Sequence, residues 1–259
     1  MAGNLEVVEV LKPAKFFYME QTNYDQRIDA WEQFLSKQRV NDAVAANFLT
    51  KVYGWMCFAL FLTALTAWAV SKIPIEIIKI YPSFVISLLL LMLGLYFGIP
   101  YWIDEVSTQT ATALFIVYSV VTGVVSSYIF VVYTKETIVG AFVAAGLTFG
   151  IMSFYGFATN KDLTSSGNLL LKALSGLIIA TVWNIFWGST VLCWFLTYAG
   201  IIIFTGLTAA CTQELKKISY EIKRGESANR QIILGALTLY LNFTILFRFL
   251  LRIFGRRYK

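Results

Sequence analysis

The sequence contains no histidine and few charged residues. Without histidine, the chain cannot build a histidine-based metal site, proton shuttle or catalytic dyad. Charged residues make up 14% of the 259 positions, whereas soluble domains contain about 25%, so the chain lacks the polar surface that would cover a water-soluble globule. Cys57, Cys193 and Cys211 lie in apolar stretches and show neither a disulfide framework nor a zinc spacing.

Acidic residues are missing from every long apolar run, because all fifteen lie in the N-terminal tail, in loops or at run ends. Acids inside a membrane are the usual device of proton relays and cation pathways, and this chain lacks it. The sequence also has no Ser–His pair, HExxH motif or Walker loop. We therefore expect no enzymatic activity, no cofactor and no metal site.

What the sequence does contain is long apolar runs, with 58% hydrophobic residues and a mean hydropathy of +0.68. Each run is long enough to cross a hydrocarbon core of about 30 Å as a helix, and lipid-exposed backbone must satisfy its own hydrogen bonds. The sequence therefore predicts an all-α, polytopic bundle of seven transmembrane helices. The predicted spans are Val52–Val70, Pro82–Ile99, Ala111–Tyr133, Thr137–Ala158, Leu169–Trp187, Ser189–Ala210 and Gln231–Phe254.

Two domains are predicted. Residues 1–50 form the one sizeable polar stretch and are expected to be a cytosolic, partly helical tail, with a short surface helix at Asp25–Phe34. This tail does not read as a secretory signal, since no basic start leads directly into an apolar core. Residues 51–259 form the seven-helix transmembrane domain.

The net charge of +6 is explained by membrane topology, and no nucleic-acid recognition module is visible. Basic residues near the spans favour a cytoplasmic N-terminus. The C-terminal tail is also basic, so the last run either crosses the bilayer or re-enters it, and the side of the C-terminus stays open. The inner-side basic residues would be Lys37, Arg39, Lys51, Lys161, Lys216, Lys217, Lys223, Arg224 and Arg230.

The last run is polar on two opposite sides. Thr238 and Asn242 share one face at i, i+4 spacing, and Tyr240, Thr244 and Arg248 share another. A helix that is polar on both sides is poorly suited to lipid on either, so we expect this helix to be enclosed by the others. The alternative is that Arg248 reaches the membrane surface, which its position near the helix end allows.

Small residues predict where helices approach or turn. Gly146 and Gly150 form a GxxxG pair, and Ser119, Gly123 and Ser127 form a similar ridge of small residues; both are typical of close packing between membrane helices. Gly188 alone separates the fifth and sixth runs, so a tight hairpin or a broken helix is expected there.

Three segments resemble the bacterial Bax inhibitor-1 family. They are Phe48–Met56 (FLTKVYGWM), Leu207–Lys216 (LTAACTQELK) and Leu237–Phe247 (LTLYLNFTILF), and the resemblance extends from about Ala45 to Gly255. It implies a seven-helix bundle in the bacterial inner membrane, with the last helix central, and a passive, pH-sensitive calcium leak. It also implies a gate of two aspartates, one ending the sixth helix and one in the seventh, whose shared protons respond to pH.

This chain departs from that pattern at both gate positions. Cys211 stands where the resemblance implies the first aspartate and Asn242 where it implies the second. The two side chains are expected to meet through a weak, neutral hydrogen bond. The candidate gate or pore residues are therefore Cys211, Asn242, Thr238 and Arg248, and the expectation is that calcium or other cations leak poorly or without pH dependence between about pH 6 and 8.

Two other functions remain open besides a leak through the lipid bilayer. One is a non-conducting regulator that binds other membrane proteins, such as a membrane protease or stress and cell-death components, through the tail and the basic segment Lys216–Arg230. The other is a secondary transporter, which is less favoured because no internal repeat is found and Gly188 is the sole obvious interruption.

Overall fold

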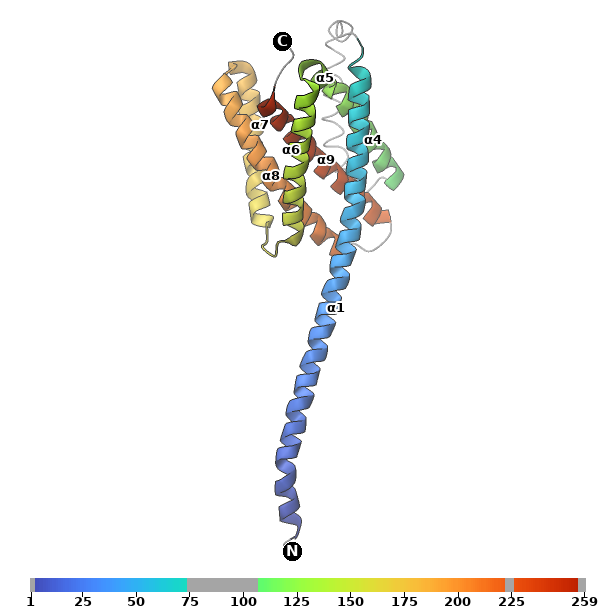
Figure 1. The fold of residues 1–259 in the computed structure, drawn as a ribbon, viewed down its shortest axis with the longest axis vertical. Coiled ribbons are helices and arrows are strands. Elements are labelled where there is room, and N and C mark those ends of the chain that lie inside the picture. Colours follow the sequence, from blue (N-terminus) through green and yellow to red (C-terminus); the bar gives the residue numbers. More distant parts are fainter. Residues whose placement is uncertain (1–2, 74–106, 222–225, 256–259) are drawn as a thin grey trace. The chain divides into compact units, whose positions relative to one another are not determined.

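The computed structural model describes residues 3–73, 107–221 and 226–255, which are almost entirely helical and include no β-strand (Figure 1). The helices are α1 (Gly3–Val70), α4 (Thr108–Ser126), α5 (Tyr128–Val132), α6 (Lys135–Ala158), α7 (Thr164–Trp187), α8 (Thr190–Glu221) and α9 (Glu226–Phe254). The predicted all-α class is confirmed for the described residues.

The chain divides into two compact units, Met1–Ala46 and Asn47–Lys259, and each is described by itself. The first unit consists of the N-terminal part of α1, on which Ile28, Trp31 and Val40 are exposed. The second unit contains the remainder of α1 and all the other described helices.

Six helices are long and apolar enough to cross a membrane within the described ranges. The predicted spans other than Pro82–Ile99 all overlap them, whereas Pro82–Ile99 lies outside the described residues. The six spans are Asp42–Val70, Thr108–Val132, Lys135–Ala158, Thr164–Trp187, Thr190–Glu221 and Ser227–Phe254.

Hydroxyl side chains and one glycine set several helix ends. Ser107 Oγ accepts the Thr110 N–H at 3.2 Å at the start of α4, and Ser189 Oγ accepts the Leu192 N–H at 3.3 Å at the start of α8. These bonds satisfy amides that have no partner within a helix. Gly188 ends α7 in the left-handed conformation (φ 65°), which suits a residue without Cβ. The expected tight hairpin at Gly188 is present.

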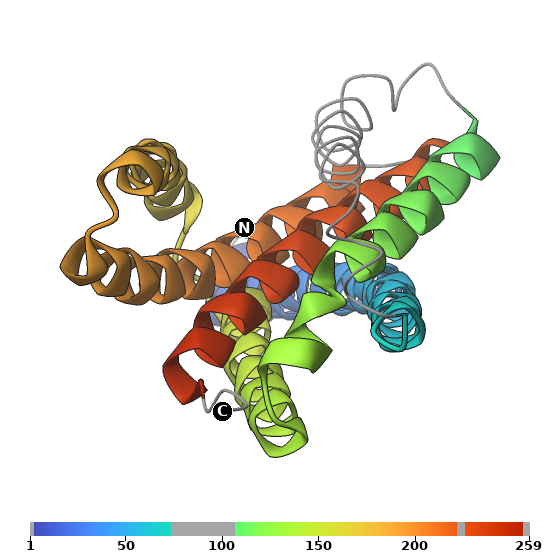
Figure 2. The same cartoon turned by 90° about the horizontal axis from the view of Figure 1, so that it is seen from above.

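Helix α9 packs against α4, α6 and α8, and in Figure 2 it runs between α4 and α8. The largest apolar cluster joins its buried Leu237 and Tyr240 to Val52 of α1 and Phe115 of α4. By contrast, α7 packs against α8, and the apolar window of α7 is only 6% buried. Most of the apolar surface of α7 is therefore not covered by the described helices.

The close helix approaches do not lie where the GxxxG motif predicted them. A Cβ at Gly146 or Gly150 would meet no atom within 4 Å in the described structure. A Cβ at Gly156 would instead overlap the carbonyl oxygen of Ala209, and one at Gly123 would lie 2.7 Å from the Thr63 carbonyl oxygen. Among the described residues, no helix therefore packs closely on Gly146 and Gly150, whereas Gly156 lies on the face of α6 toward α8, and the close approach predicted at Gly123 is present between α4 and α1.

Candidate functional site

The side chains of Cys211 and Asn242 meet where α8 and α9 pack together. Asn242 Nδ2 donates to Cys211 Sγ at 3.6 Å, and Asn242 is only 7% exposed. The expected contact between a thiol and an amide is therefore present. Neither group is a carboxylate. The contact therefore joins α8 to α9 without a carboxyl group that could bind or release a proton.

The neighbouring residue Thr212 extends the polar contacts of α8 toward α1. Its Oγ1 lies 3.4 Å from the Tyr53 hydroxyl, and it also donates to the Thr208 carbonyl at 2.9 Å. Thr212 is fully buried. Consecutive residues of α8 thus contact α9 through Cys211 and α1 through Thr212.

The opposite face of α9 has its own polar partners. The hydroxyl of Tyr240 lies 2.7 Å from Thr63 Oγ1 on α1. The rings of Phe115 and Tyr118 on α4 meet the Tyr240 ring edge-on, with centroids 5.8 and 6.1 Å away. Tyr240 is completely buried, so its hydroxyl needs partners inside the protein, and Thr63 of α1 and Thr122 of α4 provide them.

Arg248 lies on that same face, two turns further along. Its guanidinium donates to Ser126 Oγ on α4 at 3.0 Å. Beside it lies a cavity of about 110 Å³, which is lined by apolar side chains and by Thr63, Thr122, Ser126 and Thr244. Arg248 is therefore partly buried between helices and held by a hydroxyl.

The four candidate gate residues do not form one cluster. Cys211 and Asn242 are in contact, and Thr238 lies one turn before Asn242 but donates to the Leu234 carbonyl of its own helix at 3.0 Å. Arg248 contacts α4 on the other side of α9. The structure thus joins the two gate positions to each other and places Arg248 in a separate polar group.

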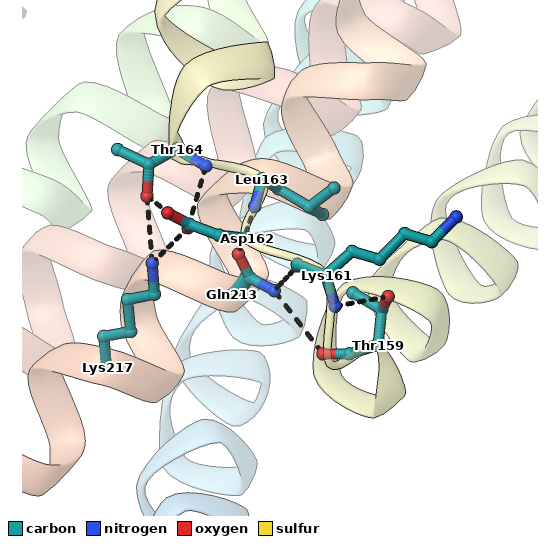
Figure 3. A network of polar contacts seen from close by, with 7 residues as sticks. All are labelled: Thr159, Lys161, Asp162, Leu163, Thr164, Gln213 and Lys217. Atoms are coloured by element: carbon teal, nitrogen blue, oxygen red, sulfur yellow. Dashed lines mark hydrogen bonds and ion pairs between the residues drawn. The ribbon is translucent and has the colours of Figure 1, made fainter.

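Gln213, two residues after Cys211, connects α8 to the loop that joins α6 and α7 (Figure 3). Its Oε1 accepts the Leu163 N–H at 2.7 Å, and its Nε2 donates to the Lys161 carbonyl at 2.7 Å and to the Thr159 carbonyl at 3.5 Å. Gln213 is 7% exposed. One buried amide therefore satisfies backbone groups that this turn leaves without helical partners.

Lys217 holds the same loop one turn further along α8. Its Nζ lies 2.6 Å from Asp162 Oδ1 and donates to Thr164 Oγ1 at 2.9 Å. The N–H and hydroxyl of Thr164 also donate to Asp162 Oδ1, at 3.2 and 2.7 Å. These bonds, led by the one from Lys217, lower the pKa of Asp162 to about 2. Asp162 is thus charged at every physiological pH.

This network of Gln213, Lys217 and the loop between α6 and α7 was not predicted from the sequence. Gln213 and Lys217 lie about 50 residues from their loop partners, and nothing in local periodicity pairs positions so far apart. The local pattern that could have indicated polar contacts here is the polar run Thr212–Gln213–Glu214, which directly follows an apolar span. In the described part of the chain, no group of three or more His, Cys, Asp or Glu residues is placed to hold a metal ion.

These helices define the class: an integral membrane protein of the polytopic α-helical kind. The sequence model described as "Inhibitor of apoptosis-promoting Bax1" matches residues 45–259. The chain belongs to the Bax inhibitor-1 family, as the resemblance of its three motifs indicated.

Several bacterial proteins are similar over most of their length. Inner membrane protein YbhL of Escherichia coli K12 is 42% identical over 215 residues, covering 82% of this chain and 92% of the relative. A Borreliella burgdorferi protein is 38% identical over 227 residues, covering 86% and 97%. Protein RP147 of Rickettsia prowazekii is 36% identical over 225 residues, covering 86% and 94%.

Proposed function

We propose that this family member is a passive leak for calcium or other small cations in the bacterial inner membrane, and that it lacks a proton-operated gate. The observation that carries the second part is the contact between Cys211 and Asn242. The gate implied by the family resemblance needs two carboxyl groups that share protons. Here a thiol and an amide occupy those positions, so no carboxylate pair is available to titrate at this junction.

We further propose that α9 is the central helix of a bundle that crosses the bilayer seven times. Support comes from its packing against α4, α6 and α8 and from the partners on both of its polar faces. Hydroxyl and carbonyl oxygens can line a cation path without carboxylates, and Thr63, Thr122 and Thr244 supply such groups.

Two further features belong to the same proposal. The N-terminus is cytoplasmic, because the segments with most of the basic residues would then be retained on that side. The protein is not an enzyme, since the sequence has no histidine and no catalytic motif.

The test is calcium flux in proteoliposomes made from the purified full-length protein. We expect a slow leak whose rate changes less than twofold between pH 6 and 8. The double variant Cys211→Asp with Asn242→Asp should gain a steep pH dependence in that range, because two close carboxyl groups cannot both ionise freely.

The matched control is Cys211→Asn, which introduces a side chain of the size of aspartate without a carboxyl group. It should remain insensitive to pH, as should each single aspartate variant. Steep pH dependence in the unaltered protein would refute the loss of the gate. A flux equal to that of empty liposomes would refute the leak itself.

A second candidate is a non-conducting regulator that binds a membrane protease or stress components. The observation that favours it is the exposed apolar surface of the first unit, where Trp31 is 59%, Val40 62% and Val44 41% exposed. A variant that lacks residues 1–36 separates the two functions. A leak should keep its flux without this segment, whereas a regulator should lose its bound partner.

A further inference from the structure

A cavity of about 480 Å³ lies at the end of the second unit where α7 turns into α8 and where α9 ends. Its wall includes Asn184 of α7, the turn residues Ser189 and Thr190, and Arg252 of α9. This is the end of α8 opposite to Cys211 and Lys217. The cavity is thus separate from the α8–α9 junction and from the Gln213 network.

The cavity is electropositive. Arg252 lines it, and the described residues around it include no acidic side chain. The guanidinium donates one bond to Cys193 Sγ, but a guanidinium has five N–H donors. The side chain is exposed, so its other donors are available to an anion that enters the cavity.

The N-terminus of α8 adds to this positive potential. Ser189 satisfies the N–H groups of Leu192 and Cys193 through its Oγ and its carbonyl oxygen, at 3.3 and 3.1 Å. Within the described chain, the N–H groups of Thr190 and Val191 have no acceptor. Free amides at the start of a helix, together with a nearby arginine, form a suitable site for a phosphate group.

Asn184 supplies a hydrogen-bond acceptor at the cavity wall. Its Oδ1 is buried and has no hydrogen-bond partner in the described structure, although the residue lines the cavity. Buried acceptors without a donor are uncommon in folded proteins. A ligand that suits both Arg252 and Asn184 therefore combines an anionic group with a hydrogen-bond donor.

The aromatic residues around the cavity indicate where it lies in the membrane. Trp194 lines it, and Trp187, just before the turn, is 71% exposed and stacks on Trp183 with centroids 5.3 Å apart. Tryptophan at the ends of membrane spans is typical of the headgroup level. The phosphate available at this level is that of phospholipids.

We propose that this cavity binds a phospholipid headgroup that combines a phosphate with a hydrogen-bond donor, as in phosphatidylglycerol and phosphatidylethanolamine. Arg252 and the α8 amides hold the phosphate, and Asn184 accepts from the hydroxyl or ammonium group. Phosphatidylcholine has the same phosphate but no donor on its headgroup, so it is discriminated against. The proposal does not depend on ion conduction.

The test measures the thermal unfolding midpoint of the delipidated full-length protein in detergent while short-chain lipids are added. Phosphatidylglycerol and phosphatidylethanolamine should raise the midpoint at concentrations at least tenfold lower than phosphatidylcholine. Arg252→Gln should raise the half-saturating concentration of phosphatidylglycerol at least tenfold. Asn184→Leu should remove the difference between phosphatidylglycerol and phosphatidylcholine.

Lys135→Gln is the matched control, because Lys135 is an exposed cation two residues after the lining residue Tyr133 but does not itself line the cavity. Lys135→Gln should leave the half-saturating concentrations of phosphatidylglycerol and phosphatidylcholine unchanged. Equal effects of the three lipids on the unaltered protein would overturn the proposal, even if a variant fails to fold. Weakening by Lys135→Gln equal to that by Arg252→Gln would also overturn it. Protection by inorganic phosphate at the same concentration as phosphatidylglycerol would identify free phosphate as the ligand and refute the lipid.

Discussion

Lys217 on α8 and Asp162 in the loop between α6 and α7 form an ion pair with Nζ 2.6 Å from Oδ1. Together with the Gln213 bonds, this pair fixes the loop to the last turns of α8. Gln213, where the contacts with this loop begin, lies two residues after Cys211. The end of α8 therefore connects the contact between Cys211 and Asn242 with the loop between α6 and α7. The first two predictions concern this link.

The Asp162 contact should be insensitive to pH between 5 and 8. The lowered pKa of about 2 means that its contribution is complete above the ordinary pKa of about 3.9 and is lost as the pH falls toward 2. Hydrogen exchange of the Thr164 amide, which donates to Asp162, measures this after correction for intrinsic rates. Protection should stay constant over that range, and Asp162→Asn should reduce it at every pH.

Glu214→Gln is the control for the Asp162 prediction, because it removes one negative charge from an exposed position on α8 near Lys217. It should leave the Thr164 amide protected. A protection that fell between pH 8 and 5 in the unaltered protein would contradict the ion pair as described.

Gln213→Leu should destabilise the protein by about 1–3 kcal/mol, because it leaves the Leu163 N–H and the Lys161 carbonyl without their buried partner. Gln213→Glu should cost at least as much at neutral pH, because an ionised carboxylate oxygen would replace the Nε2 donor and face the Lys161 and Thr159 carbonyl oxygens in a buried position. Unfolding in detergent measures both changes. A leucine variant as stable as the unaltered protein would contradict this prediction. It would mean that water, in place of the Gln213 amide, satisfies the Leu163 N–H and the Lys161 carbonyl.

Local sequence patterns predicted the helices well and the contacts between them unevenly. The apolar runs located six described spans because hydrocarbon imposes both length and helix, and Gly188 marked a turn because little else separates two runs. The meeting of Cys211 with Asn242 was expected from the family resemblance. Gln213 was missed because its bonds depend on how α8 packs beside a distant loop, which no local period encodes.

Tyr240→Phe should cost about 0.5–1.5 kcal/mol, because it removes the hydroxyl 2.7 Å from Thr63 and leaves the ring packing of Phe115 and Tyr118 in place. Tyr198→Phe is the control, since Tyr198 is 55% exposed. Thermal unfolding of both variants in the same detergent makes the comparison. Equal stability of the two would show that Thr63 does not need Tyr240 as a partner.

Gly156→Ala and Gly146→Ala compare two glycines of the same helix, α6. A Cβ at Gly156 overlaps the Ala209 carbonyl oxygen, which belongs to the backbone of α8 and cannot move without shifting that helix, whereas a Cβ at Gly146 meets nothing within 4 Å. Gly156→Ala should therefore destabilise by about 1–3 kcal/mol, and Gly146→Ala should be neutral or stabilising because alanine favours the helix. Unfolding in detergent gives both values. If Gly146→Ala proved the more damaging change, the GxxxG pair and not Gly156 would be the contact surface of α6.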